Sequence, residues 1–290
     1  MTKSAIRSMV LTLAFTMLAA AGEVPDHARI APDDAGKSFR VLATNKTSTL
    51  EKELNEAAAE GYAFYALDLR KHGRSWLAHQ HPCFCKDLAE YDADITAAID
   101  EIGGPVLLAG HSTGGLICSL YAARGERRDQ VRALWLNSPF FDWKVTPFKR
   151  AQLGMAALTG QAFPFLNDPK ALSPAYIRSI HRDFGGEWDF DLKLKPLHGF
   201  PAYFGWVGAV LAAQHKVHAG LTIQCPVLTL HSDEADIVLD WRHMAKWGRT
   251  LGPSARVLAF PGGLHDLVLS PREVREAVFS ALFSWGDVSG

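Results

Sequence analysis

A single serine stands between two glycines in the stretch AGHSTGG at residues 109–115, directly after the apolar run 105–108. The pattern Gly110-x-Ser112-x-Gly114 between a strand and a helix is typical of a nucleophilic serine on a tight, strained turn. The glycines are needed because side chains at their positions would collide with the turn. A tight turn can also carry a serine with no chemical role. The prediction that Ser112 is a nucleophile therefore depends on finding its partners.

A nucleophilic serine needs a base, and the base needs an acid that orients it. His265 lies in the Gly-rich stretch 260–270, FPGGLHDLVLS, which follows the last apolar run and can return an imidazole to the serine. His111 is expected to point into the turn, and His72 belongs to a different loop. We predict His265 as the base. The backbone N–H of Thr113, at the start of the next helix, is the expected first donor to an oxyanion.

The acid is expected after the preceding apolar run, because the chain order in this kind of site is serine, acid, histidine. The stretch TLHSDEADIVLD at 229–240 offers three carboxylates, namely Asp233, Glu234 and Asp236. Asp142 is a more distant candidate, and Asp266 is expected to serve its own loop. The residues alone leave the choice open.

Apolar runs alternate with helical patterns along most of the chain. Strands are predicted at 38–44, 62–69, 105–110, 131–139, 225–232 and 255–260, and helices at 45–61, 88–103, 115–125, 240–252 and 271–285. Continuous apolar strands that alternate with helices indicate an α/β fold, with a mostly parallel sheet covered by helices on both faces.

One insertion interrupts this alternation. Residues 143–222, the lid segment, hold no clear strand and are rich in aromatic residues, Pro and Gly. We expect the lid segment to cover the C-terminal edge of the sheet, where ligands bind in open α/β sheets. The core is then formed by 62–142 and 223–290. Part of an apolar acyl pocket is expected from the aromatic residues in and beside the lid segment: Phe140, Phe141, Trp143, Phe148, Phe163, Phe165, Tyr203, Phe204 and Trp206.

The composition limits which classes of protein and partner are expected. The 290 residues are 48% apolar, with 16 Phe and 8 Trp, so a sizeable core can be buried. The net charge of −1 favours neither nucleic acid nor an anionic membrane as a partner. The four cysteines are too few and too scattered for a disulfide framework. The histidines lack metal-ligand spacing and no phosphate-cradling glycine loop is present, so we expect no metal and no cofactor.

The first residues have the layout of a secretory signal peptide. Lys3 and Arg7 precede an uncharged run at 8–22, and small residues suit cleavage near Ala21. The run is too short to span a bilayer comfortably. If residues 1–22 act as a signal, the protein is exported, and otherwise it is cytoplasmic. A buried first helix is the alternative interpretation of this segment.

Four motifs together resemble a known family: YALDLRKHGRS at 65–75, GHSTGG at 110–115, ADIVLD at 235–240 and GGLHDLVLS at 262–270. They are similar to α/β-hydrolases grouped with monoglyceride lipases, lysophospholipases and serine aminopeptidase-like proteins. The first motif matches the family's D-x-R-x-x-G-x-S loop. The resemblance covers about residues 62–290. It implies Ser112 as nucleophile, His265 as base and Asp236, in preference to Asp233, as acid.

The N-terminal part departs from the family pattern. Members of the family carry a His-Gly pair that supplies the second oxyanion donor, and antiparallel strands ahead of it, and this chain shows neither. We interpret residues 1–60, with the atypical strand–helix segment 23–61, as a fused segment that replaces the first part of a hydrolase. A substitute donor is then expected from Ala43, Thr44, Asn45 or Lys46. The loss of one oxyanion donor typically costs ~10²–10³ in rate.

The expected function is hydrolysis of carboxylic esters through an acyl-enzyme. Short or medium acyl esters and monoacylglycerol-like lipids are the expected small-molecule substrates. A dehalogenase or epoxide hydrolase of this fold would have an aspartate in place of Ser112. The alternative is a hydrolase-like protein whose incomplete oxyanion hole leaves it impaired or inactive. Acyl preference and oligomeric state give no signal in the sequence.

Overall fold

The computed structural model describes residues 9–13, 64–170, 172–193 and 195–289. Within these residues, the main sheet has six strands in the order β2-β1-β3-β4-β7-β8, and every neighbouring pair is parallel. The strands are β1 (Met9–Leu13), β2 (Phe64–Ala66), β3 (Val106–His111), β4 (Val131–Asn137), β7 (Val227–His231) and β8 (Ala255–Ala259). The expected α/β class with a mostly parallel sheet is confirmed.

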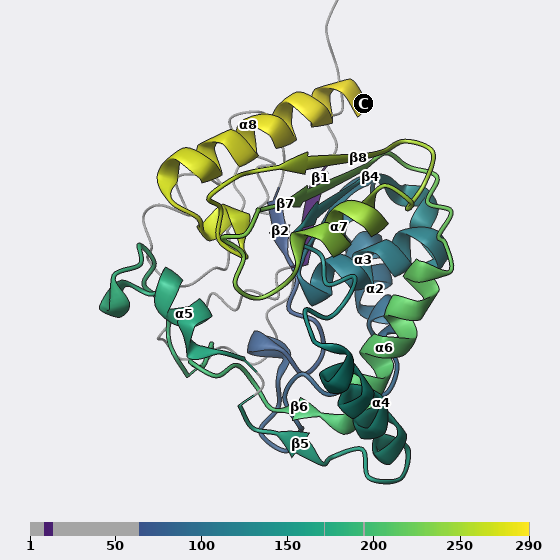
Figure 1. The fold of residues 1–290 in the computed structure, drawn as a ribbon. Helices are drawn as coiled ribbons and strands as arrows, with labels where there is room; N and C mark the ends of the chain where they lie inside the picture. The colour runs from purple at the N-terminus through teal and green to yellow at the C-terminus, as the bar shows by residue number, and fades with distance from the viewer. Residues whose placement is uncertain (1–8, 14–63, 171, 194, 290) are drawn as a thin grey trace, which may run out of the picture.

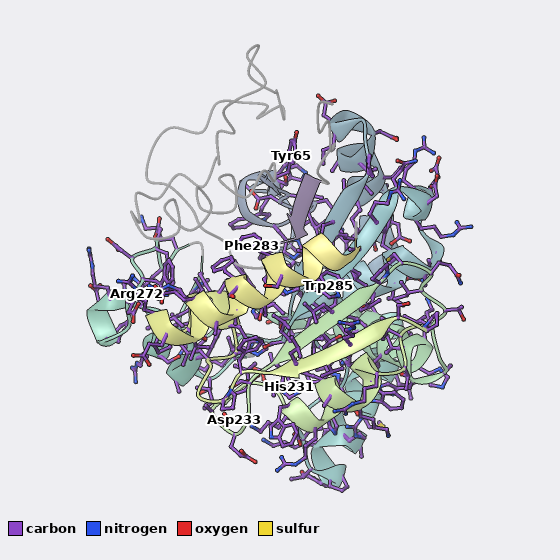
Figure 2. All side chains as sticks on the ribbon, turned by 90° about the horizontal axis from the view of Figure 1, so that it is seen from above. Tyr65, His231, Asp233, Arg272, Phe283 and Trp285 are labelled. Carbon is purple, nitrogen blue, oxygen red and sulfur yellow. The ribbon has the colours of Figure 1, made fainter. Side chains whose placement is uncertain are left out.

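Helices cover the two faces of this sheet (Figure 1). They are α2 (Asp92–Ile102), α3 (Thr113–Arg124), α7 (Trp241–Gly248) and α8 (Arg272–Ser289), with short 3-10 helices η1 (Gly73–Ser75), η2 (Leu88–Tyr91), η3 (Arg128–Gln130) and η5 (Leu267–Leu269). Figure 2, which looks onto α8, shows Phe283 and Trp285 on this helix. Trp285 packs with Leu107 and Ala109 of β3 on that face of the sheet.

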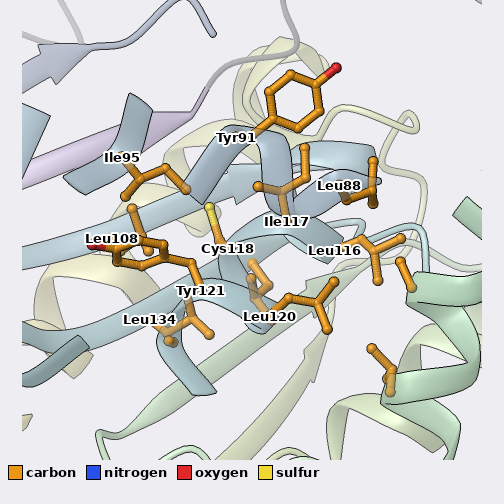
Figure 3. Close-up of a cluster of buried hydrophobic side chains, with 14 of the residues drawn as sticks. Leu88, Tyr91, Ile95, Leu108, Leu116, Ile117, Cys118, Leu120, Tyr121 and Leu134 are labelled. Carbon is orange, nitrogen blue, oxygen red and sulfur yellow. The ribbon is translucent and has the colours of Figure 1, made fainter. Parts of the chain in front are cut away.

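Alternate residues of each strand supply the two halves of the core, because successive strand residues point to opposite faces. Leu107 packs towards α8, whereas its neighbour Leu108 joins the cluster on the other face. That second cluster is built around η2, α2 and α3 (Figure 3). Tyr91 and Tyr121 are both fully buried in it. The central strands are therefore apolar on both faces, which explains their continuous apolar sequences.

The N-terminal expectations fall mostly on residues that the structure does not describe. These include the strand at 38–44, the helix at 45–61 and the substitute oxyanion donors. One described piece, β1, lies inside the segment expected to act as a signal peptide, and it pairs with both β2 and β3. The short apolar run MVLTL suits a signal peptide and a buried strand equally, so composition could not distinguish the two. The signal function of residues 1–22 stays a prediction.

The loop after β2 explains the motif at 65–75. Gly73 has a φ of +47°, and a side chain there would bring a Cβ within 2.6 Å of Asp68 Oδ1. The Ser75 hydroxyl donates to the Asp68 carbonyl over 2.9 Å. Arg70 forms a 2.7 Å ion pair with Asp94 of α2. The motif residues thus shape this loop and tie it to the neighbouring helix.

A long connection between β4 and β7 contains the lid segment. Its elements are α4 (Pro147–Ala162), β5 (Asn167–Asp168), α5 (Pro174–Ile180), η4 (Arg182–Phe184), β6 (Ala202–Tyr203) and α6 (Phe204–His218). The two-residue strands β5 and β6 form a small antiparallel sheet that the sequence does not signal. α4, β5 and β6 lie together at the end of the molecule away from α8 (Figure 1). Among the described residues, no helix has both the length and the apolar character needed to cross a membrane.

Candidate active site

Ser112 lies between the end of β3 and the start of α3. Its φ of +52° and ψ of −120° are strained for a residue with a side chain. Two hydrogen bonds hold this conformation: the Ser112 N–H donates to the Asn137 carbonyl over 3.0 Å, and the Phe140 N–H donates to the Ser112 carbonyl over 2.9 Å. The turn that carries the serine is therefore fixed by the chain at and after the end of β4.

The structure brings Ser112, His265 and Asp236 together from three separate loops. His265 Nε2 lies 3.1 Å from Ser112 Oγ, and His265 Nδ1 lies 2.9 Å from Asp236 Oδ2. An ionised carboxylate can only accept, so the ring proton belongs on Nδ1 and leaves Nε2 free to accept from the serine hydroxyl. This is the arrangement in which an imidazole can take a proton from a nucleophile.

Asp236 is completely buried, and its surroundings keep it charged. Burial alone would raise the pKa of this carboxyl. The charge and hydrogen bond of His265, and the backbone N–H groups of Leu239 and Val238, outweigh burial and hold the pKa below its ordinary value. The two N–H groups donate to Asp236 Oδ1 over 2.9 Å and 2.8 Å. The second oxygen is therefore left to orient His265.

The other candidate acids make different contacts. Asp233 accepts from the Ala235 and Gly262 N–H groups, and Figure 2 labels it in the loop after β7. Glu234 pairs with Arg242, and Asp142 pairs with Arg150. Asp266 is buried and accepts from the Asn137 side chain, so it does serve the loop of His265.

Asn137, which sequence reasoning missed, joins the serine turn to the histidine loop. Its backbone carbonyl accepts from Ser112, as described above. Its side-chain nitrogen donates to Asp266 over 2.7 Å, and its side-chain oxygen accepts from the Leu267 N–H over 3.1 Å. The one signal in the sequence is an amide residue that ends the apolar strand VRALWLN. Asn137 thus fixes the residues that directly follow His265.

His111 packs beside His265 and stays neutral. Its Nδ1 lies 3.1 Å from the Asn137 carbonyl, and the two histidine ring centroids are 4.8 Å apart. Burial lowers the pKa of His111 to about 4, although the nearby Asp266 carboxylate acts in the opposite direction. His111 is therefore neutral at pH 7, and it does not oppose a positive charge that forms on His265 during a reaction.

A cavity of about 900 Å³ opens over Ser112 and His265. Most of its lining residues belong to the lid segment, with apolar walls that include Leu153, Ile177 and Val207. Four of the aromatic residues expected in an acyl pocket line it, namely Phe140, Trp143, Phe204 and Trp206. Phe141 is buried in the core instead, and Phe148, Phe163 and Phe165 are exposed on or near α4. Tyr203 packs against Phe84 and His81.

Thr113 is the described candidate for an oxyanion donor. It is the first residue of α3, and first-turn N–H groups have no acceptor inside their own helix. Leu13, the last residue of β1, pairs in register with Gly110 beside this turn. Among residues 9–13, 64–170, 172–193 and 195–289, no group of three His, Cys, Asp or Glu is placed to hold a metal ion.

The serine turn predicts a sharp steric limit at Gly110. A Cβ at this position would lie 2.5 Å from the Gly114 carbonyl oxygen and 2.7 Å from Cys118 Sγ. We expect Gly110→Ala to lower the free energy of unfolding by about 1–3 kcal/mol, because the packed backbone must shift. Urea unfolding followed by circular dichroism measures the change. Gly104→Ala is the control, because no atom lies within 4 Å of its added Cβ, and equal effects of the two substitutions would contradict the steric argument.

Asn137→Leu should damage both stability and the position of His265. It removes the Asn137 amide that hydrogen-bonds the buried Asp266 carboxylate and the Leu267 N–H, a loss of about 1–3 kcal/mol. Denaturant unfolding checks the stability, and the nuclear magnetic resonance signals of the His265 ring check its environment. Asn167→Leu removes one hydrogen bond from an exposed amide and serves as the control. A stable Asn137→Leu variant with unchanged His265 signals would refute the linking role.

The buried His111 should make stability depend on pH. Its pKa is about 4 in the folded protein and about 6.5 when unfolded, so the unfolded chain binds more protons between these values. The stability contributed by neutral His111 is complete above pH 6.5 and is lost as the pH falls towards 4, by up to about 3 kcal/mol. Urea unfolding from pH 4 to 8 should show a shallower decline for His111→Gln than for the unsubstituted chain. Parallel curves would argue against a neutral buried His111.

Comparisons with known proteins agree with this architecture. The family described as serine aminopeptidase, S33, matches residues 45–272. The match begins within segment 23–61, so the family pattern reaches further towards the N-terminus than the four motifs indicate. A comparison with curated proteins finds no significant match.

Solved structures with the same fold include two lipases and an esterase. A soluble variant of monoglyceride lipase from Saccharomyces cerevisiae, in complex with a substrate analogue, is 18% identical, with a TM-score of 0.66 over 99% of this chain and 90% of that one. Paleococcus ferrophilus monoacylglycerol lipase is 23% identical, with a TM-score of 0.64 over 84% and 90%. An esterase from Exiguobacterium antarcticum is 16% identical, with a TM-score of 0.59 over 97% and 92%. The chain has the α/β-hydrolase fold and belongs to the serine aminopeptidase S33 family of hydrolases.

Proposed function

We propose that the protein hydrolyses carboxylic esters, with Ser112 as nucleophile, His265 as general base and Asp236 as the group that orients His265. The observation that carries this proposal is the pair of distances around His265, 3.1 Å to Ser112 Oγ and 2.9 Å to Asp236 Oδ2. The strained serine turn supports the same roles, because it lifts Oγ towards the cavity that a substrate would fill.

We assign each proton transfer in the proposed reaction to His265 Nε2. Ser112 Oγ attacks the acyl carbonyl carbon while His265 Nε2 takes the hydroxyl proton. The tetrahedral intermediate then breaks its ester C–O bond, the alcohol leaves with the proton from Nε2, and the acyl group remains on Ser112. Water attacks the acyl-enzyme, Nε2 takes a proton from it, and release of the carboxylic acid returns that proton to the serine.

The negative charge that develops on the substrate's carbonyl oxygen needs hydrogen-bond donors. We assign the Thr113 N–H as the first, since it points from the start of α3, where the partial positive charge of a helix is concentrated. The second donor proposed from the sequence, at Ala43, Thr44, Asn45 or Lys46, lies outside the described residues.

The cavity favours an apolar acyl ester of short or medium chain, or a monoacylglycerol-like lipid. Its volume of about 900 Å³ lies in the range of small-molecule sites, and its walls are largely aliphatic and aromatic. We propose that the lid segment forms the roof, because it supplies most of those walls. Two of the solved structures with this fold are named as monoacylglycerol or monoglyceride lipases, which supports this substrate class.

The charges around the cavity favour an ester over a peptide with a free amino terminus. An aminopeptidase must bind an ammonium group, for which carboxylates are suitable partners. This cavity is lined by three lysines, Lys144, Lys149 and Lys195, and by one exposed carboxylate, Asp168. The family name alone therefore does not decide between the two substrate classes, and the charge of the site supports the ester.

A fluorophosphonate probe tests the assignment directly. We expect the protein to be labelled and to hydrolyse p-nitrophenyl butyrate, and we expect Ser112→Ala to abolish labelling and reduce kcat by at least ~10³-fold. Mass spectrometry of the labelled peptide locates the adduct. Ser254→Ala, at an exposed serine, should label and turn over as the unsubstituted protein does.

An aminoacyl p-nitroanilide in the same assay separates the two substrate classes. Faster turnover of the anilide than of the ester would overturn the ester assignment. A folded protein that neither labels nor hydrolyses would favour the alternative function, a hydrolase-like protein with an incomplete oxyanion hole.

A further inference from the structure

Lys195 holds a positive charge in the wall of the cavity. Its side chain is partly buried and lines the same cavity as Ser112 and His265. Its Nζ lies 5.3 Å from the ring centroid of Tyr176 and 5.6 Å from that of Phe190, so aromatic faces surround the ammonium group. Rings of this kind attract a cation, but they do not neutralise its charge.

No carboxylate of the described residues forms an ion pair with Lys195 within 4.0 Å. Other partly buried cations in the same residues do have such partners: Lys71 pairs with Glu90, and Arg124 pairs with Asp92. A charge withdrawn from water without a partner is costly, and it becomes favourable once an anion reaches it. Lys195 is thus a cation whose pairing is incomplete in the protein alone.

The other two lysines of the cavity are in different situations. Lys144 Nζ donates to the Asp236 carbonyl over 2.9 Å and so is already engaged. Lys149 lies on α4 and is exposed, so water solvates it. Lys195 is the lysine of this set that combines partial burial with an open position.

Tyr176 packs against both Lys195 and His265 in this wall. It is buried, it lines the cavity, and its hydroxyl has no hydrogen-bond partner among the described residues. Its ring also lies 5.4 Å from the His265 ring, so one side chain contacts both the base and Lys195. Burial raises the pKa of Tyr176 well above its ordinary value, which keeps the hydroxyl protonated and able to donate.

We propose that Lys195, packed against the Tyr176 and Phe190 rings, binds a carboxylate or phosphate of the substrate, so that among the apolar esters proposed above those that also carry a negative charge are preferred. The inference deepens the proposed function and rests on it, because it names a property of the ester that Ser112 would attack. The apolar walls would hold the rest of the molecule, and the Lys195 ammonium group would fix its orientation relative to the serine.

The protonation of Lys195 is compatible with this role. Burial lowers its pKa to about 8, with the Asp266 carboxylate acting in the opposite direction. The side chain is therefore mostly charged at pH 7. His111 and His265 also line this cavity, and their carboxylate partners, Asp266 and Asp236, form no ion pair with Lys195 within 4.0 Å.

Matched pairs of esters test the proposal. In 3-acetoxybenzoate the anion lies in the leaving alcohol, and 3-acetoxybenzamide is its neutral counterpart. In mono-4-nitrophenyl succinate the anion lies in the acyl part, and the corresponding methyl ester is neutral. The quantity measured is the ratio of kcat/KM for the anionic ester to that for its neutral counterpart. The ratio does not depend on the fraction of active protein, so a partly misfolded variant still gives a valid result.

We expect Lys195→Met to lower this ratio by ~10–100-fold in at least one pair, as for loss of a hydrogen bond to a charged group. Lys195→Arg should restore most of it, and Lys86→Met, at an exposed lysine outside the cavity lining, should leave it close to the unsubstituted value. The pair that responds identifies which part of the ester carries the anion. Ratios that do not change in either pair would overturn the proposal while the ester hydrolase assignment stands.

A binding experiment separates failure of this inference from failure of the proposed function. Benzene-1,3-dicarboxylate is titrated calorimetrically into the Ser112→Ala protein, with and without Lys195→Met. Binding that weakens by ~10-fold or more on loss of Lys195 supports the anion site even if no ester is hydrolysed. Equal binding by the two proteins, or no binding by either, counts against it.

Discussion

The candidate site depends on one buried amide, Asn137, at the end of β4. Its backbone carbonyl fixes the turn that carries Ser112, and its side chain fixes the two residues that follow His265. Nucleophile and base come from segments more than 150 positions apart, as their hydrogen bond records. Without this shared contact, the positions of the two loops relative to each other would not be fixed. A hydrogen-bonded group inside the sheet removes that freedom before any substrate arrives, which is what preorganisation requires.

The charges of the site follow from burial. Asp236 stays ionised in a fully buried position because His265 and two backbone N–H groups face it. His111 is held in the neutral form in the same surroundings, so of these two neighbouring imidazoles His265 is the one left to gain a positive charge in the proposed reaction. Both effects arise from low polarity, which penalises an isolated charge and strengthens a paired one. The parallel sheet makes this burial possible, since helices cover both of its faces.

The sequence could single out Ser112 and His265 as candidates because each has a local pattern tied to the end of a strand. Spacing could not separate Asp233 from Asp236, since both follow β7 in the same loop. The structure brings Asp236 to His265, while Asp233 accepts from Gly262 and Ala235. Asn137 has a single weak signal, an amide at the end of an apolar strand, and Lys195 has none, because their roles depend on partners brought close only by folding. The apolar run at β1 has a clear pattern, but this pattern suits both a signal peptide and a strand of the sheet.

The same low polarity gives the lysine in the cavity its significance. In water, a lone ammonium group attracts an anion weakly, because solvent screens both charges. The Lys195 ammonium packs against Tyr176 and Phe190, and no carboxylate of the described residues pairs with it. It is therefore less hydrated than a lysine in water, and its attraction for an anion is less screened. An apolar cavity alone would accept many acyl esters in several orientations. Lys195, at a fixed place in its wall, would select among them by charge, close to the imidazole that is proposed to donate a proton to the leaving group.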